Sequence, residues 1–312
     1  MFLSLGIGVA HASPQDKKIF VAYYESWYAL GDGTLDSILT KLPPEISILN
    51  LAFAKPNAVY QGSLDLSGSG LEFPYTGTVL KSSIEEVKKK NPQTKVLISV
   101  GGESFQQWNK LNPSGIRDLV LAFGLDGIDI DFEPLDPGCH RDKKKGMVCQ
   151  SDPLLQQAID SLRAVLPRPM ILSLTLPSDA AFGAGRWATT GPQGSPSYGL
   201  GLALFRDKSR SANVDLVNIM MYDAGPELNA MAAYDSFRDY YRGALTIGFT
   251  PPPEEWGTHA YDKNEVRSVL AEGLKKGANG AMLFGLRKKA PRSWITPFVN
   301  TIAVTLSNGE KE

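Results

Sequence analysis

The fold can be inferred from ten residues, Leu125-Asp126-Gly127-Ile128-Asp129-Ile130-Asp131-Phe132-Glu133-Pro134, in which acidic and large apolar side chains alternate. Successive side chains of a β-strand point to opposite faces, so Asp129, Asp131 and Glu133 share one face. The other face is apolar and suits a covering layer of helices. In a closed barrel the acidic face would line the interior. Glu133 would then lie at the C-terminal rim, where barrel enzymes keep their catalytic groups.

Seven other short runs rich in apolar or β-branched residues repeat this pattern along the chain. Together the eight runs are residues 19–24, 46–54, 96–100, 127–132, 171–176, 214–222, 245–249 and 280–284. Most are separated by segments with helical spacing, such as Ile116, Leu119, Val120 and Phe123 before Gly124. Alternating strands and helices predict a parallel α/β protein, and eight such units predict a (β/α)8 TIM barrel.

An open, doubly wound sheet is the alternative arrangement for eight strands. That fold usually carries a glycine-rich phosphate-binding turn after its first strand. Here the first run ends in Tyr23-Tyr24-Glu25-Ser26-Trp27, without a glycine. The sequence therefore favours the barrel, and no linker or repeat divides residues 13–312 into separate domains.

The bulk composition narrows the class of partner. The chain has 312 residues, of which 43% are hydrophobic, and its 32 Lys and Arg nearly balance its 33 Asp and Glu. A net charge of −1 gives no general attraction for nucleic acid. No apolar run is long enough to cross a bilayer. We therefore expect neither a nucleic-acid nor a membrane partner. We also expect a monomer.

The N-terminus resembles an incomplete secretion signal. An apolar run over residues 2–9 precedes Ala10-His11-Ala12, which has the small-x-small pattern of a signal-peptidase site, although no basic residue precedes the run. We expect residues 1–12 to be a signal peptide and the mature protein to be extracellular or periplasmic. Cys139 and Cys149 lie ten positions apart, and in an exported protein they would form a disulfide or remain two free thiols.

The acidic face of the 127–132 strand has a chemical use. Residues two apart on a strand lie about 6.6 Å from each other at Cα, so the carboxyl groups of Asp131 and Glu133 are close enough to interact. Neighbouring acids in a shielded site cannot all ionise, so the pKa of one should rise. A carboxylic acid that stays protonated near neutral pH can protonate a departing glycosidic oxygen. A divalent metal on Asp129 and Asp131 is the alternative, but we find no second acidic cluster to complete it and expect no metal or other cofactor.

Several motifs share their order and spacing with one enzyme family. Asp126-x-x-Asp129-x-Asp131-x-Glu133 resembles the signature of glycoside hydrolase family 18, the chitinases and their relatives. Ser99-Val100-Gly101-Gly102 is similar to the family's Ser-x-Gly-Gly, and Met220-x-Tyr222-Asp223 to its Met-x-Tyr-Asp. Residues 50–54, Asn-Leu-Ala-Phe-Ala, resemble its second-strand motif.

The resemblance implies hydrolysis of β-1,4-linked N-acetylglucosamine polymers, such as chitin and chito-oligosaccharides, by a retaining, substrate-assisted mechanism. It implies that Glu133 is the acid and base, that Asp131 binds the acetamido N–H, that Tyr222 binds the acetamido oxygen, and that Asp129 partners Asp131. The substrate-binding candidates that follow from it are Asp126, Tyr23, Phe53, Met220, Asp223 and Phe284.

Two departures from the family pattern bear on the substrate. The family usually has a tryptophan at the end of the eighth strand, where this chain has Phe284, which offers a smaller stacking surface. Only residues 250–279 separate the last two runs, too few for the insertion domain of some family chitinases, so we expect an open cleft and endo cleavage. Trp27, Trp108, Trp187 and Trp256 follow other strands and could stack on sugars or pack the loops.

Two other functions use the same barrel. The first is a chitin-binding lectin without activity, which the presence of Glu133, Asp131 and Tyr222 disfavours. The second is an endo-β-N-acetylglucosaminidase acting on N-glycans, which would need the same acids and differ only in its loops.

Overall fold

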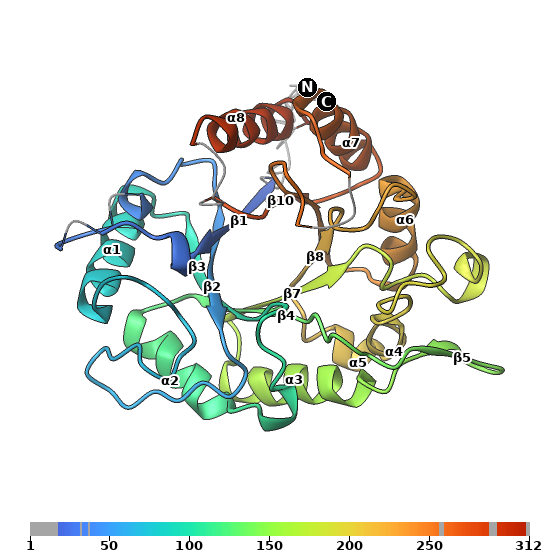
Figure 1. Cartoon of the computed structure of the whole chain (residues 1–312), viewed down its shortest axis with the longest axis horizontal. Coiled ribbons are helices and arrows are strands. Elements are labelled where there is room, and N and C mark those ends of the chain that lie inside the picture. Colours follow the sequence, from blue (N-terminus) through green and yellow to red (C-terminus); the bar gives the residue numbers. More distant parts are fainter. Residues whose placement is uncertain (1–17, 32, 37, 256–258, 287–291, 310–312) are drawn as a thin grey trace, which may run out of the picture.

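The computed structural model describes residues 18–31, 33–36, 38–255, 259–286 and 292–309. Within them, eight parallel strands close into a barrel in the order β1-β2-β3-β4-β7-β8-β9-β10 (Figure 1). These strands are β1 (Ile19–Glu25), β2 (Ile48–Ala54), β3 (Lys95–Gly101), β4 (Gly127–Asp131), β7 (Ile171–Pro177), β8 (Leu216–Met220), β9 (Ala244–Phe249) and β10 (Gly280–Leu283). Each one falls on an apolar run of the sequence, which confirms the predicted TIM barrel.

Helices surround the barrel, as Figure 1 shows. They are α1 (Gly77–Lys90), α2 (Pro113–Phe123), α3 (Asp152–Val165), α4 (Leu202–Arg206), α5 (Lys208–Ser211), α6 (Ala230–Tyr240), α7 (Lys263–Lys275) and α8 (Arg292–Gly309). The start and stop of α2 show why helices form where they do. The Asn112 side chain accepts a hydrogen bond from the Gly115 N–H, and Pro113 occupies the first turn. Gly124 ends the helix with a left-handed φ of 65°.

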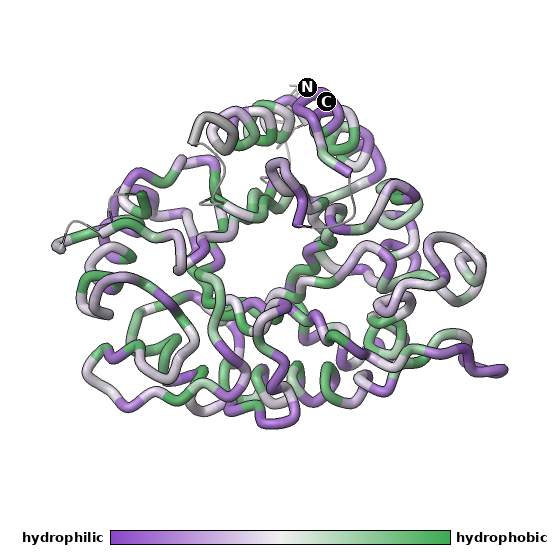
Figure 2. The backbone as a smooth tube through the Cα atoms, viewed as in Figure 1, coloured by the Kyte–Doolittle hydropathy of each residue, from purple (hydrophilic) through white to green (hydrophobic). Residues whose placement is uncertain are grey.

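Two apolar layers lie on either side of the strands. Ile128, Ile130 and Phe132 of the β4 segment are fully buried in the larger cluster, between the strands and the helices. Figure 2 shows hydrophobic stretches along the strands and hydrophilic ones in many of the outer loops. The interior cluster contains Tyr23 and Tyr222, and Asp129 and Asp131 are buried on the inner face of the same strand. The alternation of apolar and acidic residues in the sequence therefore corresponds to the outer and inner faces of the barrel wall.

A short hairpin leaves the barrel after β4. Its strands, β5 (His140–Asp142) and β6 (Gly146–Val148), are antiparallel, and the disulfide Cys139–Cys149 closes its base. Its tip is hydrophilic (Figure 2). The connection from β9 to β10 contains only one helix, α7, in its described part, so no insertion domain is present there. The expected signal peptide and Trp256 lie outside the described residues. No described helix is both long and apolar enough to cross a bilayer.

The position of Asp126, at the N-terminal end of β4, contradicts its predicted contact with substrate. Asp126 accepts a hydrogen bond from the Val96 N–H at 2.8 Å, and its carboxylate lies 2.7 Å from Lys88 Nζ and 3.8 Å from Lys95 Nζ. It therefore lies at the opposite end of the strand from Glu133. The prediction that Asp126 binds substrate is wrong, because its carboxylate links β4 to β3 and α1.

Replacing Asp126 with alanine should weaken the fold. The change removes two ion pairs and a charged hydrogen bond to the backbone, so we expect the free energy of unfolding to fall by about 1–3 kcal/mol. Denaturant unfolding measures it. Glu85→Ala is the control, because its partly exposed pair with Lys81 should contribute less than about 1 kcal/mol. Unchanged stability of the Asp126 variant would contradict this role.

Candidate active site

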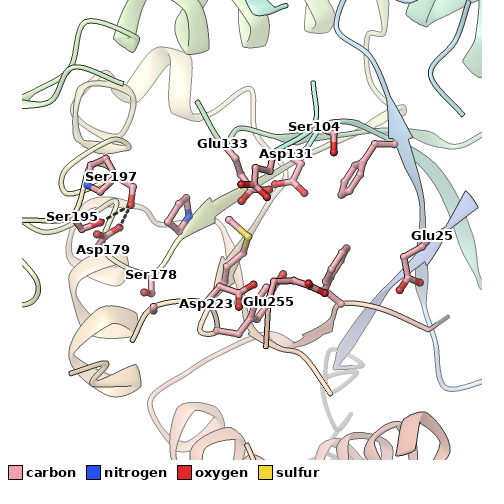
Figure 3. A pocket seen from close by; sticks show the side chains of 18 of the residues that line it. Glu25, Ser104, Asp131, Glu133, Ser178, Asp179, Ser195, Ser197, Asp223 and Glu255 are labelled. Carbon is pink, nitrogen blue, oxygen red and sulfur yellow. Dashed lines mark hydrogen bonds between the residues drawn. The ribbon is translucent and has the colours of Figure 1, made fainter. Parts of the chain in front are cut away.

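A cavity of about 530 Å³ opens at the C-terminal ends of the barrel strands (Figure 3). Its size is within the range of ligand-binding pockets. All eight barrel strands or the loops that follow them contribute to its lining. The lining includes Glu25, Trp27, Phe53, Glu103, Ser104, Asp131, Glu133, Ser178, Asp179, Ser195, Ser197, Met220, Tyr222, Asp223, Glu255 and Phe284. Seven of the residues predicted for catalysis or binding are therefore brought together here, namely Glu133, Asp131, Tyr222, Phe53, Met220, Asp223 and Phe284.

The carboxyl groups of Asp131 and Glu133 are hydrogen-bonded to each other, and Figure 3 shows them side by side. Burial, followed by the negative charge of Glu103, raises the pKa of Glu133 from 4.5 to about 7. Burial and the charges of Glu133 and Asp129 raise the pKa of Asp131 well above its usual range. The pair therefore retains a proton at neutral pH, as the spacing of the acids predicts.

Asp129 lies below the cavity, fully buried, inside a cage of hydroxyl groups. Tyr23 OH and Ser99 Oγ each donate to its Oδ2 at 2.7 Å. Ser173 Oγ and Thr175 Oγ1 donate to its Oδ1 at 2.6 and 3.1 Å. These bonds stabilise the ionised form and partly offset the effect of burial, which raises its pKa. The negative charge of Asp129, which lies below Asp131, therefore contributes to the raised pKa of Asp131.

Tyr23 corrects a second candidate. Its hydroxyl is hydrogen-bonded to Asp129 and to Thr175 Oγ1, the latter at 2.6 Å, and only 1% of the residue is exposed. It is not among the residues that line the cavity. The prediction of a direct substrate contact is wrong for Tyr23, because its strand position places it one layer deeper than the rim.

Aromatic rings form one wall of the cavity. Phe284 stacks on Phe53 at 6.3 Å and on Tyr222 at 6.1 Å, and Trp27 stacks on Phe53 at 5.8 Å between ring centroids. Burial and the charge of Asp131 raise the pKa of Tyr222 well above its usual range, so its hydroxyl stays a neutral donor. Such a row of rings beside polar groups can hold a sugar by its apolar face.

The structure shows which of the described tryptophans lines the cavity and which pack against the rest of the protein. Trp27 lines the cavity with 38% of its surface exposed. Trp108 is buried against Phe132, with ring centroids 5.2 Å apart, and the Trp187 indole donates to Asp239 at 2.7 Å. Those two serve packing. In the described part of the chain, no group of three or more His, Cys, Asp or Glu side chains is arranged to hold a metal ion.

A comparison with protein families agrees with this geometry. The family model for glycosyl hydrolases family 18 matches residues 19–236, which include six of the eight runs and every acid of the β4 segment. The chain belongs to glycoside hydrolase family 18.

Characterised relatives of this family 18 chain include chitinases. A chitinase of Plasmodium falciparum is 29% identical over 130 residues, which cover 38% of this chain and 33% of the relative. Exochitinase 1 of Streptomyces olivaceoviridis is 24% identical over 233 residues, covering 69% of this chain and 37% of the relative. The chain thus matches little more than a third of the length of either. The crystal structure of a group IV chitinase from Ostrinia furnacalis, in complex with allosamidin, has the same fold, with a TM-score of 0.62 and 15% identity over 94% of this chain and 100% of that one.

Sequence reasoning missed four acids of this family 18 cavity, namely Glu25, Glu103, Asp179 and Glu255. A simple signal marks two of them. Glu25 ends β1 on the same face as Tyr23, and Glu103 directly follows Gly101-Gly102 at the end of β3. Asp179 and Glu255 lie in loops after β7 and β9, where strand periodicity no longer indicates a direction.

Removing the charge of Glu133 should stabilise the protein at alkaline pH. The folded pKa of about 7 exceeds the ordinary 4.5, so the cost of the buried charge is absent below pH 4.5 and grows until about pH 7. We expect Glu133→Gln to raise the thermal midpoint at pH 8 by at least about 2 °C and to change it little at pH 4. Calorimetry at both pH values tests this, with Glu85→Gln as a surface control. Equal or lower stability of Glu133→Gln at pH 8 would contradict it.

Proposed function

We propose that this chain hydrolyses β-1,4-linked N-acetylglucosamine polymers such as chitin, with Glu133 as the acid and base. The observation that carries the proposal is the pKa of Glu133, raised to about 7 beside Asp131 in a cavity walled by aromatic rings. A carboxylic acid of that pKa can donate a proton to a departing sugar oxygen near neutral pH. Membership of family 18 and the chitinase relatives support the same substrate class.

In the proposed reaction the substrate supplies its own nucleophile. Glu133 protonates the glycosidic oxygen as the bond to the anomeric carbon breaks, and the oxygen of the 2-acetamido group attacks that carbon. The product is an oxazolinium ion, whose N–H donates to Asp131 and whose oxygen accepts from Tyr222. The Glu133 carboxylate then takes a proton from water, the water oxygen attacks the anomeric carbon, and the configuration is retained.

Each neighbouring group has a stated task in this scheme. The negative charge of Asp131 stabilises the positive charge of the intermediate. Asp129 contributes its charge from below, held in place by its hydroxyl cage. Phe284 is the stacking surface under the reacting sugar, in place of the family's usual tryptophan. The short connection between β9 and β10 leaves the cleft open along its length, which favours endo cleavage.

We also propose that the protein is exported and acts as a monomer. The disulfide Cys139–Cys149 supports export, because such bonds persist in oxidising compartments. The apolar run before Ala10-His11-Ala12 supports it as well.

Cleavage of chitin hexasaccharide tests the reaction directly. The wild type should release dimers, trimers and tetramers, and Glu133→Gln should lower kcat at least about 1000-fold while still binding the hexasaccharide, because only the proton donor is lost. Mass spectrometry identifies the products, and NMR of the fresh product shows the β-anomer if configuration is retained. Binding without cleavage by the wild type would favour the lectin, and cleavage of glycoprotein N-glycans instead would favour the endo-β-N-acetylglucosaminidase.

The pH profile tests the assignment of the acid. Hydrolysis requires protonated Glu133, so kcat/KM should fall as the pH rises through about 7. Glu103 raises the pKa of Glu133 by its negative charge, so Glu103→Gln should move this alkaline limb to lower pH. The surface variant Glu85→Gln should leave the profile unchanged. An alkaline limb that does not move in Glu103→Gln would show that another group sets it.

A further inference from the structure

The proton donor lies beyond the hydrogen-bonded part of its strand. β4 ends at Asp131, whose carbonyl accepts a hydrogen bond from the Gly102 N–H at 2.9 Å, and the Phe132 N–H donates to a carbonyl of β7 at 3.2 Å. Among the described residues, no main-chain group of residues 133–135 is hydrogen-bonded to another main-chain group. The barrel wall therefore leaves the backbone of Glu133 without a neighbouring strand to hold it.

One amide side chain takes the place of that neighbouring strand. Gln106, in the loop after β3, donates from Nε2 to the Glu133 carbonyl at 2.9 Å, and its Oε1 accepts from the Leu135 N–H at 3.1 Å. In a parallel sheet, a residue bonds in the same way to the carbonyl before and the N–H after the residue that it faces. Pro134, between these two groups, has no N–H to satisfy. The Gln106 side chain therefore extends the sheet past the end of β4.

The same amide also holds the acid that acts on Glu133. Its Nε2 donates a second hydrogen bond, to the Glu103 carbonyl at 2.7 Å. The Glu103 N–H donates to the Glu133 carboxyl group, and the charge of Glu103 raises the pKa of Glu133. An amide has two N–H donors and one carbonyl oxygen, so two carbonyls and one N–H are partners that fix its orientation. One side chain therefore joins the backbone of Glu133 to that of Glu103.

Two glycines allow the loop to approach β4 closely. Gly101 and Gly102 have φ of 108° and 70°, in the region that residues with side chains rarely adopt. A Cβ on Gly101 would lie 2.2 Å from the Asp131 carbonyl oxygen, which is too close for any side chain. The turn at these glycines brings Gln106 over the end of β4. Gln106 is not among the residues that line the cavity, so its contacts act on Glu133 and not on a ligand.

We propose that Gln106 is a positioning residue for hydrolysis, whose amide holds the carboxyl group of Glu133 within reach of the glycosidic oxygen. Proton transfer needs the two oxygens at hydrogen-bonding distance, and a displacement of about 1 Å can slow a reaction about 100-fold. Without the amide, residues 133–135 lose both hydrogen bonds that hold their backbone. This role rests on the proposed function, because Gln106 acts only through the proton that Glu133 transfers.

Truncation of Gln106 separates positioning from binding. For chitin hexasaccharide, Gln106→Ala should lower kcat about 10- to 100-fold, because the acid is displaced, and should change KM by less than about threefold. Gln106→Glu keeps the length of the side chain but loses the amide donors. It should lower kcat at neutral pH in the same range, and it tests the proposal even if Gln106→Ala fails to fold.

Gln107→Ala is the matched control. Gln107 is the next residue of the same loop, and its Oε1 has no hydrogen-bond partner among the described residues. Its truncation removes the same atoms without removing a hydrogen bond to Glu133, so kcat should stay within about twofold of the wild-type value. Circular dichroism and the thermal midpoint show whether each variant is folded. Equal losses of kcat in Gln106→Ala and Gln107→Ala would mean that loop packing matters and not the amide, which would overturn the proposal.

The pH profile gives a readout that a loss of stability alone would not change. Burial, followed by the charge of Glu103, raises the pKa of Glu133 to about 7. Both causes weaken when the segment is no longer held, since water reaches the carboxyl group and Glu103 is no longer fixed beside it. The alkaline limb of kcat/KM should therefore lie at least about 0.5 pH lower in Gln106→Ala than in the wild type.

A double variant tests whether Gln106 acts through Glu133. In protein that already carries Glu133→Gln, Gln106→Ala should lower the residual kcat by less than about threefold, because the acid that it positions is gone. Losses that multiply in full would mean that Gln106 acts through another group, and they would overturn the proposal.

The outcomes separate this role from the proposed function. If the wild type cleaves the hexasaccharide, and both Gln106→Ala and Gln106→Glu keep its alkaline limb and its kcat within about twofold, the positioning role is overturned and the proposed function stands. If the folded wild type cleaves no N-acetylglucosamine polymer, the proposed function falls, and the role of Gln106 falls with it.

Discussion

The structure depends on one constraint, which is that the carboxyl groups of Asp129 and Asp131 are buried in the barrel and that no lysine, arginine or histidine of the described residues is hydrogen-bonded to either. Asp129 meets this constraint with four hydroxyl donors, from Tyr23, Ser99, Ser173 and Thr175. These donors come from three other strands, so the cage also fixes the register of the barrel around β4. Because these donors stabilise the ionised form of Asp129, Asp131 and Glu133 lie above a negative charge, and the two cannot both ionise easily. The raised pKa of Glu133 is the consequence, and it gives the site its proton donor.

A buried polar layer continues this arrangement across the barrel. Thr246 Oγ1 donates to Asn218 Oδ1 at 2.6 Å, and Asn218 Nδ2 donates to Thr175 Oγ1 at 3.0 Å. Thr175 in turn contacts the Tyr23 hydroxyl. The interior therefore consists of an acidic, aromatic rim above a layer in which these polar side chains are hydrogen-bonded to one another. Side chains in such a layer have few alternative partners, so the Asp131 side chain above them is held in place by the rigid wall.

Much of this could be predicted from the sequence, because strand alternation is a local property. The inward direction of Asp129, Asp131 and Glu133 follows from their spacing, and Tyr222 follows from its place at the end of β8. The depth of a side chain along the barrel axis cannot be predicted from strand alternation in the same way. The family resemblance implies substrate contacts for Tyr23 and Asp126, whereas Tyr23 lies a layer below the cavity and Asp126 lies at the far end of its strand. The loop acids Asp179 and Glu255 had no periodic signal, since their positions depend on how distant loops pack.

The row of rings from Trp27 through Phe53 and Phe284 to Tyr222 has a thermodynamic consequence. Each ring already packs against its neighbour, so few rotamers remain to be lost when a ligand arrives. The conformational entropy of this platform was given up during folding. A ligand whose flat faces match the row can bind with little further loss of conformational entropy. A kinked or bulky ligand would have to displace the packed rings. The row therefore selects the shape of a ligand by its rigidity, independently of its charge.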